Sequence, residues 1–255
     1  MTDHIQIQKS NGVLTLVMNR PDKKNALTDA MYEALADAIE ASNDDGDVQV
    51  ILIRSEGDLF TSGNDIGEFA VVAAGGEGPR NVARFIRAIA TATKPLIAAV
   101  QGRAVGVGAT MLLHCDHVVL AEDAQLTTPF VSLALVPEAA SSLLLTRRIG
   151  HVRAFSMFAL GEAVNAHDAV AWGLANSVVP LGALLETARA VAERLTKQPL
   201  GALVATKGLM RDNDAITAHM DVESRLFLER LSTAEAREAF TAFAQRRAPD
   251  FTGLA

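Results

Sequence analysis

The sequence has few cysteine and few aromatic residues. Cysteine, tryptophan and tyrosine each occur once in 255 residues, and aromatic side chains make up only 5% of the chain. The single cysteine, Cys115, cannot form a disulfide within the chain. This cysteine usage is typical of a reducing compartment, so we expect a cytoplasmic protein.

Positive charge and long apolar runs are also scarce. Lysine and arginine number 23 against 30 acidic residues, which gives a net charge of −7 and argues against nucleic-acid binding. The N-terminal MTDHIQIQKSNG lacks the basic start and apolar centre of a signal peptide, and Thr252–Ala255 is not a peroxisomal signal. Polar residues interrupt the most apolar stretch, residues 95–121: Gln101, Arg103, His114, Asp116 and His117. We therefore expect no nucleic-acid partner and no membrane span.

The chain does show the alternation of an α/β protein. Its hydrophobic content of 49% predicts a sizeable core. Residues 4–9 and 13–18 flank a turn signal and predict a hairpin. Thr28 precedes a helical repeat of apolar residues that ends near Asn43. Further strand patterns follow at 48–54, 96–100 and 117–121. Strands separated by helical or glycine-rich stretches predict a parallel sheet with crossovers.

The second half of the chain has a different pattern. From Glu138 onward helical periodicity dominates, with one short strand near 176–179. We predict an α/β core over residues 1–195 and a helical region over residues 198–255. The glycine-rich run at 75–79 is expected to form a mobile surface loop.

A first glycine-bearing segment, GDLFTSGNDIGEF at residues 57–69, leads from a predicted strand into a short helix. Backbone N–H groups at a helix start are free to bind an anion or a developing oxyanion. The simpler explanation is an ordinary turn with Asn64 or Asp65 as the N-cap. Spacing alone favours the simpler explanation.

A second segment, VQGRAVGVGATM at residues 100–111, follows another predicted strand. Glycine allows close approach of the backbone to a ligand, here at Gly102, Gly106 and Gly108. The spacing does not match the G-x-G-x-x-G dinucleotide pattern, so a Rossmann site is a poor match. Tight packing of a helix on the sheet explains the glycines about as well as ligand binding does.

Glu138 is the only ionisable residue between Asp123 and Arg147. Desolvation raises the pKa of a carboxyl group toward the range useful for proton abstraction, so this glutamate is a candidate base. Pro137 predicts the start of a helix, and a glutamate in its first turn would be favoured by the helix dipole without any catalytic role. Both interpretations stay open from this segment alone.

Three further segments are weaker candidates: two basic ones and one that contains metal-ligand residue types. The segment NRPDKKNAL at residues 19–27 and the pair Arg246–Arg247 suit phosphates, although such runs are more often solvated surface. The run of residues 114–117, HCDH, contains metal-ligand types. Adjacent residues point in different directions and no second spaced pair follows, so we expect no metal.

Four segments together resemble the crotonase, or enoyl-CoA hydratase/isomerase, superfamily. RPDKKNAL at 20–27, FTSGNDI at 60–66, the long segment 99–130 and AFAQRRAPDF at 242–251 occur in the family's order and spacing. The resemblance implies a spiral of ββα turns with a helical C-terminal region that forms a homotrimer or a dimer of trimers. It also implies an acyl-CoA thioester substrate and no separate cofactor, because coenzyme A is part of the substrate.

The same resemblance implies the positions of the site residues. The thioester oxygen would be held by the backbone N–H groups of Asn64 and Val107, with Gly106 beside the substrate. Phe130 is expected to line an apolar acyl pocket together with Leu133, Leu135 and Val136. Coenzyme A would contact Lys24, Ala26, Leu27, Ser62, Asn64, Asp65 and Ile66.

Departures from the family pattern narrow the predicted reaction. Hydratases use two glutamates, whose positions here hold Thr110 and Phe130, and water addition needs one group to activate water and another to manage the proton. The SGND loop and the TPF…PEAASS segment resemble instead the Δ3-Δ2-enoyl-CoA isomerases, in which the catalytic glutamate corresponds to Glu138. Val107 stands where many relatives have glycine, and a β-branched residue would be strained there if the position required a positive φ.

Two alternatives to an isomerase stay open. One is another acyl-CoA reaction on the same scaffold, such as hydration or a lyase step. The other is a non-catalytic acyl-CoA-binding protein that has lost the hydratase glutamates, in which Glu138 would only decorate a helix end.

Overall fold

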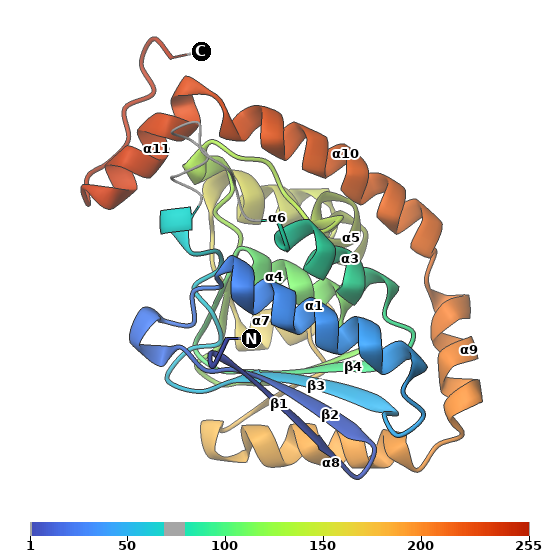
Figure 1. Cartoon of the computed structure of the whole chain (residues 1–255). Coiled ribbons are helices and arrows are strands. Elements are labelled where there is room, and N and C mark those ends of the chain that lie inside the picture. Colours follow the sequence, from blue (N-terminus) through green and yellow to red (C-terminus); the bar gives the residue numbers. More distant parts are fainter. Residues whose placement is uncertain (1, 69–79, 255) are drawn as a thin grey trace.

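The computed structural model describes residues 2–68 and 80–254, so the loop predicted at 75–79 lies outside the described residues (Figure 1). Within these ranges the strands form one six-stranded and one three-stranded sheet. The larger sheet has the order β1 (Ile5–Ser10), β2 (Val13–Met18), β3 (Val50–Ser55), β4 (Leu96–Val100), β6 (His117–Ala121) and β9 (Ser177–Val179). The smaller sheet has the order β5 (Arg103–Val105), β7 (Gln125–Thr127) and β8 (Val164–Asn165).

The larger sheet is parallel except at one edge. Strands β1 and β2 form the predicted antiparallel hairpin, and Asn11 and Gly12 in its turn have φ values of 51° and 78°. Two positive φ values in a two-residue loop match the twist of the flanking strands. Strands β2, β3, β4, β6 and β9 pair in parallel, which confirms the predicted parallel sheet.

Alternating side chains of β3 belong to two different apolar layers. Ile51 and Ile53 belong to the main core, which also holds buried side chains of α1 (Asp29–Asp44) and α3 (Val82–Thr91). Val50 and Leu52 pack with α8 (Leu184–Thr196) in a second cluster. Figure 1 shows α1 and α3 on one side of the sheet and α8 on the other. Burying each such side chain stabilises the fold by about 1.5–3 kcal/mol.

Helix α1 begins where the sequence predicts. The Thr28 side chain accepts a hydrogen bond from the N–H of Met31, which satisfies one of the free donors at the helix start. Leu35 and Ile39 follow Met31 at helical spacing and are buried. The helix ends at Asp44, one residue beyond the predicted end.

The chain after Glu138 is mainly helical. Figure 1 shows α10 (Asn213–Leu231) and α11 (Ala234–Ala244) lying over one end of the α/β core, where α10 contacts α3 and α11 contacts the short helix η3 (Val131–Leu133). The predicted helical C-terminal region is therefore present. None of the helices in the described part of the chain combines the length and the apolarity needed to cross a membrane. The other α-helices of the described residues are α4 (Val107–Thr110), α5 (Ser141–Ile149), α6 (His151–Phe155), α7 (Ala166–Ala171) and α9 (Leu200–Met210).

Candidate active site

In the first glycine-bearing loop the backbone N–H of Asn64 has no acceptor among the described residues. Asn64 forms a parallel bridge with Leu27: the N–H of Leu27 donates to the carbonyl of Gly63, and the N–H of Asp65 donates to the carbonyl of Leu27, both at 2.9 Å. In such a bridge the N–H of the central residue points to the opposite side. No described residue accepts a hydrogen bond from the N–H of Asn64.

The conformation of this loop depends on Gly63 and Asp65. Gly63 has a φ of 90°, and a Cβ there would lie 2.9 Å from the carbonyl oxygen of Val105, so a side chain would clash. The Asp65 carboxylate accepts a hydrogen bond from the N–H of Gly67 at 3.0 Å and pairs with Arg20 at 2.7 Å. Asp65 is therefore the N-cap of the helix that begins at Ile66. The sequence had left this role open between Asn64 and Asp65. The N–H of Asn64 has no acceptor among the described residues.

The second glycine-bearing loop leaves a similar donor at Val107. Gly106 has a φ of 56°, and its carbonyl accepts hydrogen bonds from the N–H groups of Ala109 and Thr110, both at 3.0 Å. Val107 is the first residue of α4, and within the described residues its N–H has no acceptor. The positive φ falls on Gly106 and not on Val107, so the strain foreseen for a β-branched residue does not arise.

The two loops are in contact with each other. Thr61 and Ala104 form a parallel bridge, and a Cβ on Gly108 would lie only 2.4 Å from the side chain of Thr61. Gly108 thus permits close packing of the two loops. Tight packing was one of the two explanations that the sequence offered for the glycines of this segment; the other was ligand binding. The same packing brings the segments that carry the free N–H groups of Asn64 and Val107 side by side.

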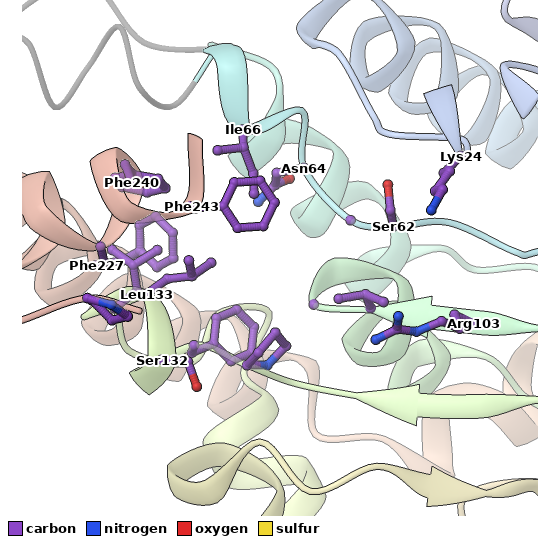
Figure 2. Close-up of a pocket in the computed structure, with 18 of the residues that line it drawn as sticks. Lys24, Ser62, Asn64, Ile66, Arg103, Ser132, Leu133, Phe227, Phe240 and Phe243 are labelled. Carbon is purple, nitrogen blue, oxygen red and sulfur yellow. The ribbon is translucent and has the colours of Figure 1, made fainter. Parts of the chain in front are cut away.

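A cavity of about 490 Å³ lies between these loops and the C-terminal helices. Figure 2 shows Lys24, Ser62 and Arg103 at one side of it and Phe227, Phe240 and other apolar side chains at the other. None of the described lining residues is a carboxylate. The cavity is therefore basic at one end and apolar at the other.

The predicted substrate contacts fall into two groups. Six of them line the cavity: Lys24, Ser62, Asn64, Ile66, Gly106 and Phe130. The remaining three do not line it. Among these, Leu27 is buried in the core, and the Asp65 carboxylate is paired with Arg20.

Several lining residues were not identified from the sequence. Arg103 lies on the three-residue strand β5, which is too short to show a periodicity. Phe227, Phe240 and Phe243 come from α10 and α11. Arg247, which follows them and also lines the cavity, belongs to the basic pair that the sequence indicated as suited to phosphates. One signal was available, because Phe243 is an exposed aromatic residue of an amphipathic helix, and the family motif at 242–251 includes it.

Glu138 is buried, with 6% of its surface exposed. Burial, and then the negative charge of Glu223, raise the pKa of Glu138 to about 8. Its Oε1 is buried without a hydrogen-bond partner among the described residues. The predicted place in a first helical turn is wrong, because α5 begins only at Ser141 and two residues of positive φ, Ala139 and Ala140, separate Glu138 from it.

Tyr32 connects Glu138 to the first loop. Its hydroxyl donates a hydrogen bond to Oδ1 of Asn64. Burial, and then the charge of Glu138, raise the pKa of Tyr32 well above its ordinary value. Glu138 does not itself line the cavity, so its carboxylate lies within electrostatic reach of the Tyr32–Asn64 pair rather than at the cavity surface.

The two positions of the hydratase glutamates hold groups without acid–base chemistry. The Thr110 hydroxyl faces the carbonyl of Val107 at 3.5 Å and is buried. Phe130 lines the cavity and packs on Phe158, with ring centroids 6.2 Å apart. Neither side chain provides the carboxylate pair that water addition requires.

Both ring nitrogens of His114 form hydrogen bonds within the fold. Its Nε2 lies 2.8 Å from the carbonyl of Ala139, and its Nδ1 lies 3.0 Å from the guanidinium of Arg211. Because a carbonyl only accepts and a guanidinium only donates, Nε2 carries the proton and the ring is neutral. Burial, followed by the charge of Arg211, lowers the pKa of His114 to about 3, in agreement with this tautomer.

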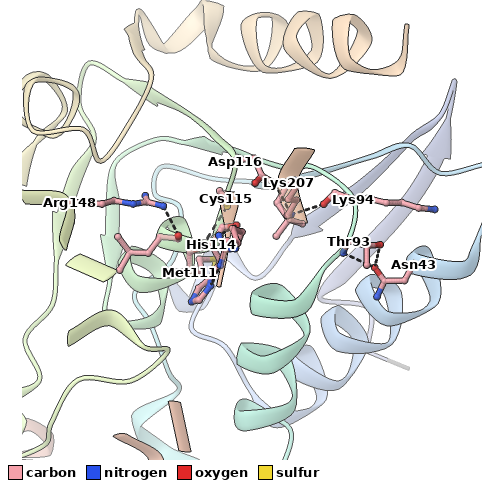
Figure 3. Close-up of polar contacts among 12 residues, drawn as sticks. Asn43, Thr93, Lys94, Met111, His114, Cys115, Asp116, Arg148 and Lys207 are labelled. Atoms are coloured by element: carbon pink, nitrogen blue, oxygen red, sulfur yellow. Dashed lines mark hydrogen bonds and ion pairs between the residues drawn. The ribbon is translucent and has the colours of Figure 1, made fainter. Parts of the chain in front are cut away.

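Asp116 and Cys115 also have structural contacts in the fold (Figure 3). Asp116 pairs with Lys207 at 2.7 Å and accepts a hydrogen bond from the N–H of Leu96 at 2.8 Å. Cys115 is buried, and burial raises the pKa of its thiol to about 12. A search of the described residues finds no group of three side chains that could hold a metal ion.

The fold and the paired loops agree with comparisons to known proteins. Residues 8–254 match the model of the enoyl-CoA hydratase/isomerase family, and the chain belongs to this family. It is 32% identical to 1,2-epoxyphenylacetyl-CoA isomerase of Escherichia coli K12, over 99% of this chain and 100% of that protein. It is 33% identical to 2,3-dehydroadipyl-CoA hydratase of the same organism, over 97% of this chain and 98% of that protein.

A solved structure confirms the fold assignment. The crystal structure of an enoyl-CoA hydratase/isomerase from Pseudoalteromonas atlantica T6c matches with a TM-score of 0.92 and 37% identity. The match covers 98% of this chain and 100% of that chain. The predicted crotonase-type fold is therefore confirmed, and an acyl-CoA thioester is the substrate class consistent with the family.

Proposed function

We propose that the protein is an acyl-CoA isomerase that shifts the double bond of a 3-enoyl-CoA to the 2,3 position with Glu138 as its one base. The observation that carries the proposal is the buried Glu138, with its raised pKa, in a site where Thr110 and Phe130 replace the hydratase carboxylates. The relatives include both an isomerase and a hydratase, so they support acyl-CoA chemistry in general.

The cavity suits an acyl-CoA in one orientation. The anionic coenzyme A would lie at the end that holds Lys24 and Arg103, where cations attract phosphates. It would contact Lys24, Ser62, Asn64 and Ile66, the predicted coenzyme contacts that line the cavity. The acyl chain would extend toward Phe130, Leu133 and the phenylalanines of α10 and α11, where burial of apolar surface favours binding. No cofactor beyond the substrate is needed for this reaction.

The thioester oxygen would accept hydrogen bonds from the two free N–H groups, those of Asn64 and Val107. These donors are fixed by the fold before the substrate arrives, so they stabilise negative charge without reorganising. Removal of one such donor typically lowers the rate about 10²–10³-fold.

One residue can carry out both proton transfers of the isomerisation. The Glu138 carboxylate, after rotating toward the cavity, removes a proton from the α carbon, and the electron pair moves to the thioester oxygen as a dienolate. The same group then returns the proton to the γ carbon, which leaves the double bond conjugated with the thioester. A positioned base of this kind typically contributes about 10²–10⁴-fold to the rate.

The apolar lining also disfavours hydration of the product. Phe130, Leu133 and Leu135 line the cavity and exclude water from the reacting carbons. Addition of water would need a second acid–base group beside Glu138, and the two positions of the hydratase glutamates hold Thr110 and Phe130.

The proposal is tested by product analysis with two substrates. Purified protein is incubated with 3-enoyl-CoA and, separately, with 2-enoyl-CoA of several chain lengths, and the products are identified by mass spectrometry and NMR. We expect 2-enoyl-CoA from the first substrate and little 3-hydroxyacyl-CoA from the second. Rapid formation of 3-hydroxyacyl-CoA would identify a hydratase instead, and tight binding without any turnover would identify an acyl-CoA-binding protein.

A further inference from the structure

The turn that carries Glu138 is held by a side chain 81 residues later in the chain. We propose that Glu223, on α10, is a positioning residue: it fixes the left-handed turn at Ala139 and Ala140 and so sets the backbone position from which the Glu138 side chain reaches the cavity. The inference deepens the proposed function, since it concerns the residue assigned as the base.

Glu223 contacts the backbone immediately after this turn. Its Oε1 accepts a hydrogen bond from the N–H of Ser142 at 2.9 Å and a second one from the Ser142 hydroxyl. The N–H of Ser141 donates instead to the carbonyl of Glu138 at 3.1 Å. Glu223 therefore supplies an acceptor for the N–H of Ser142 where α5 begins, a role usually filled by a residue next to the helix in the sequence.

The turn needs such support because its conformation is unfavourable. Ala139 and Ala140 have φ values of 64° and 52°. A residue with a Cβ is disfavoured in this left-handed region by about 1–2 kcal/mol. On the other side of the turn, His114 donates a hydrogen bond to the carbonyl of Ala139 at 2.8 Å. The backbone that follows Glu138 is thus held from two directions by buried side chains.

The orientation of the hydrogen bonds around Glu223 is also defined. The Ser142 hydroxyl lies 2.7 Å from Nε2 of His219 and donates its only proton to Glu223. The hydroxyl oxygen must then accept a hydrogen bond from Nε2–H of His219, which is one turn before Glu223 on α10. Oε1 of Glu223 lies 3.6 Å from the same His219 nitrogen. A histidine, a serine and a glutamate thus join α10 to the start of α5.

Glu223 also lies close enough to Glu138 for their charges to interact. Its negative charge is one of the two causes of the raised pKa of Glu138. Burial raises the pKa of Glu223 itself to about 7, against the lowering effect of the Ser142 hydrogen bonds. The groups that face Glu223 are therefore Glu138 and His219, together with the Ser142 hydroxyl.

The substitution Glu223→Gln tests the proposal because it keeps the shape of the side chain and removes the charge. The matched control is Glu229→Gln, the same change at an exposed position of α10. Hydrogen exchange at the amides of residues 140–142 reports on the turn, and steady-state kinetics with 3-enoyl-CoA report on the base. Thermal unfolding of each variant verifies that it is folded.

We expect Glu223→Gln to speed exchange at these amides about tenfold, because charge-assisted hydrogen bonds are replaced by weaker neutral ones. We expect kcat to fall at least about tenfold with KM changed less than about threefold, since a misdirected base slows the chemical step and not binding. Glu229→Gln should match the wild type in both measurements. If Glu223→Gln does not fold, Ser142→Ala takes its place, with a smaller effect of the same sign.

Unchanged exchange at residues 140–142, or a wild-type kcat in folded Glu223→Gln, would overturn the positioning role. A rise in KM alone would overturn it as well, because it would indicate a binding role. If the wild type converts no 3-enoyl-CoA, the proposed function fails, and the exchange measurement still decides whether Glu223 holds the turn.

Discussion

Glu138 must be ionised to act as a base, and its burial opposes ionisation. Burial and the charge of Glu223 raise its pKa to about 8, whereas an ordinary glutamate is fully ionised at neutral pH. A base with a pKa near the working pH accepts protons better than an ordinary carboxylate does. The environment of Glu138 therefore increases its basicity at the expense of the ionised fraction.

The raised pKa of Glu138 predicts the pH dependence of the reaction. The value of kcat/KM should rise about tenfold per pH unit up to a pH of about 8 and then level off, because only the ionised carboxylate abstracts a proton. Steady-state kinetics from pH 5.5 to 9.5 measure this profile. A plateau that begins near pH 5 would contradict the assignment.

The same pKa predicts an effect on stability. Because the pKa of Glu138 is near 4.5 in the unfolded chain and about 8 in the folded protein, the folded state disfavours the charged form. The wild type should lose stability relative to Glu138→Gln as pH rises between these values, by up to about 1.4 kcal/mol per pH unit.

Urea denaturation of both proteins at pH 5, 6, 7 and 8 measures this difference. Glu223 has a raised pKa too, but it is present in both proteins, so most of its contribution cancels. A constant difference across the pH range would mean that Glu138 titrates normally.

The two glycine-bearing loops can be tested at a single backbone atom. Val107 is the first residue of α4, a position where proline is tolerated because its φ is helical and its N–H has no partner within the helix. Val107→Pro should remove the proposed oxyanion donor and lower kcat about 10²–10³-fold.

Val107→Ala is the matched control for this substitution. It also shortens the buried side chain but keeps the N–H, so its kcat should stay within about tenfold of the wild type. Equal kcat values for the proline and alanine variants would contradict a role for the Val107 N–H.

The elements that the sequence predicted are those with a clear periodicity. Strands β1 and β2 flank a turn signal and show β-type alternation, β3 and β4 are short apolar runs, and α1 repeats apolar residues every three to four positions. The structure has them within a few residues of the predicted bounds. Strands β5, β7 and β8 are three residues long or shorter, which is too short for a period to be visible. The start of α5 was placed too early, since Pro137 is a helix-start signal and a left-handed Ala139–Ala140 turn has no sequence signature.

The residues of the candidate site were predictable only where a single segment of the sequence showed an unusual feature, such as clustered glycines or an isolated charge. The glycine-bearing loops and the lone Glu138 were visible in this way. Glu223 and Tyr32 were not, because their contacts join helices distant in the sequence. A signal for Glu223 existed: it shares the buried face of α10 with Met220, Phe227 and Leu231, a place where a charged residue is rare.

The whole molecule carries a net charge of −7 but has two cations, Lys24 and Arg103, at the end of the cavity where a coenzyme would lie. Lys24, Arg103 and Arg247 all line the cavity. The pair Arg247–Glu238 is exposed, so its contribution to stability is small. The single, buried Cys115 suits the reducing cytoplasm that we propose as the location of the protein.

Large apolar side chains on the surface support the proposed homotrimer or dimer of trimers. Leu209 and Met210 at the end of α9 are 90% and 80% exposed, and Leu228 on α10 is 65% exposed. Surfaces of this kind commonly mark contacts between chains. We expect sedimentation analysis to give a trimer or hexamer and the double substitution Leu209→Asp with Met210→Asp to weaken assembly. A monomer at all concentrations would contradict this expectation.

The most direct test of the central claim is the ultraviolet absorbance of a 3-enoyl-CoA solution after addition of enzyme, because only the 2-enoyl product has a double bond conjugated with the thioester. With wild-type protein the absorbance should rise to a plateau, and with folded Glu138→Gln the rate should fall at least about 10²-fold. A flat trace for the wild type across several chain lengths, or near-wild-type turnover by Glu138→Gln, would contradict the one-base isomerase.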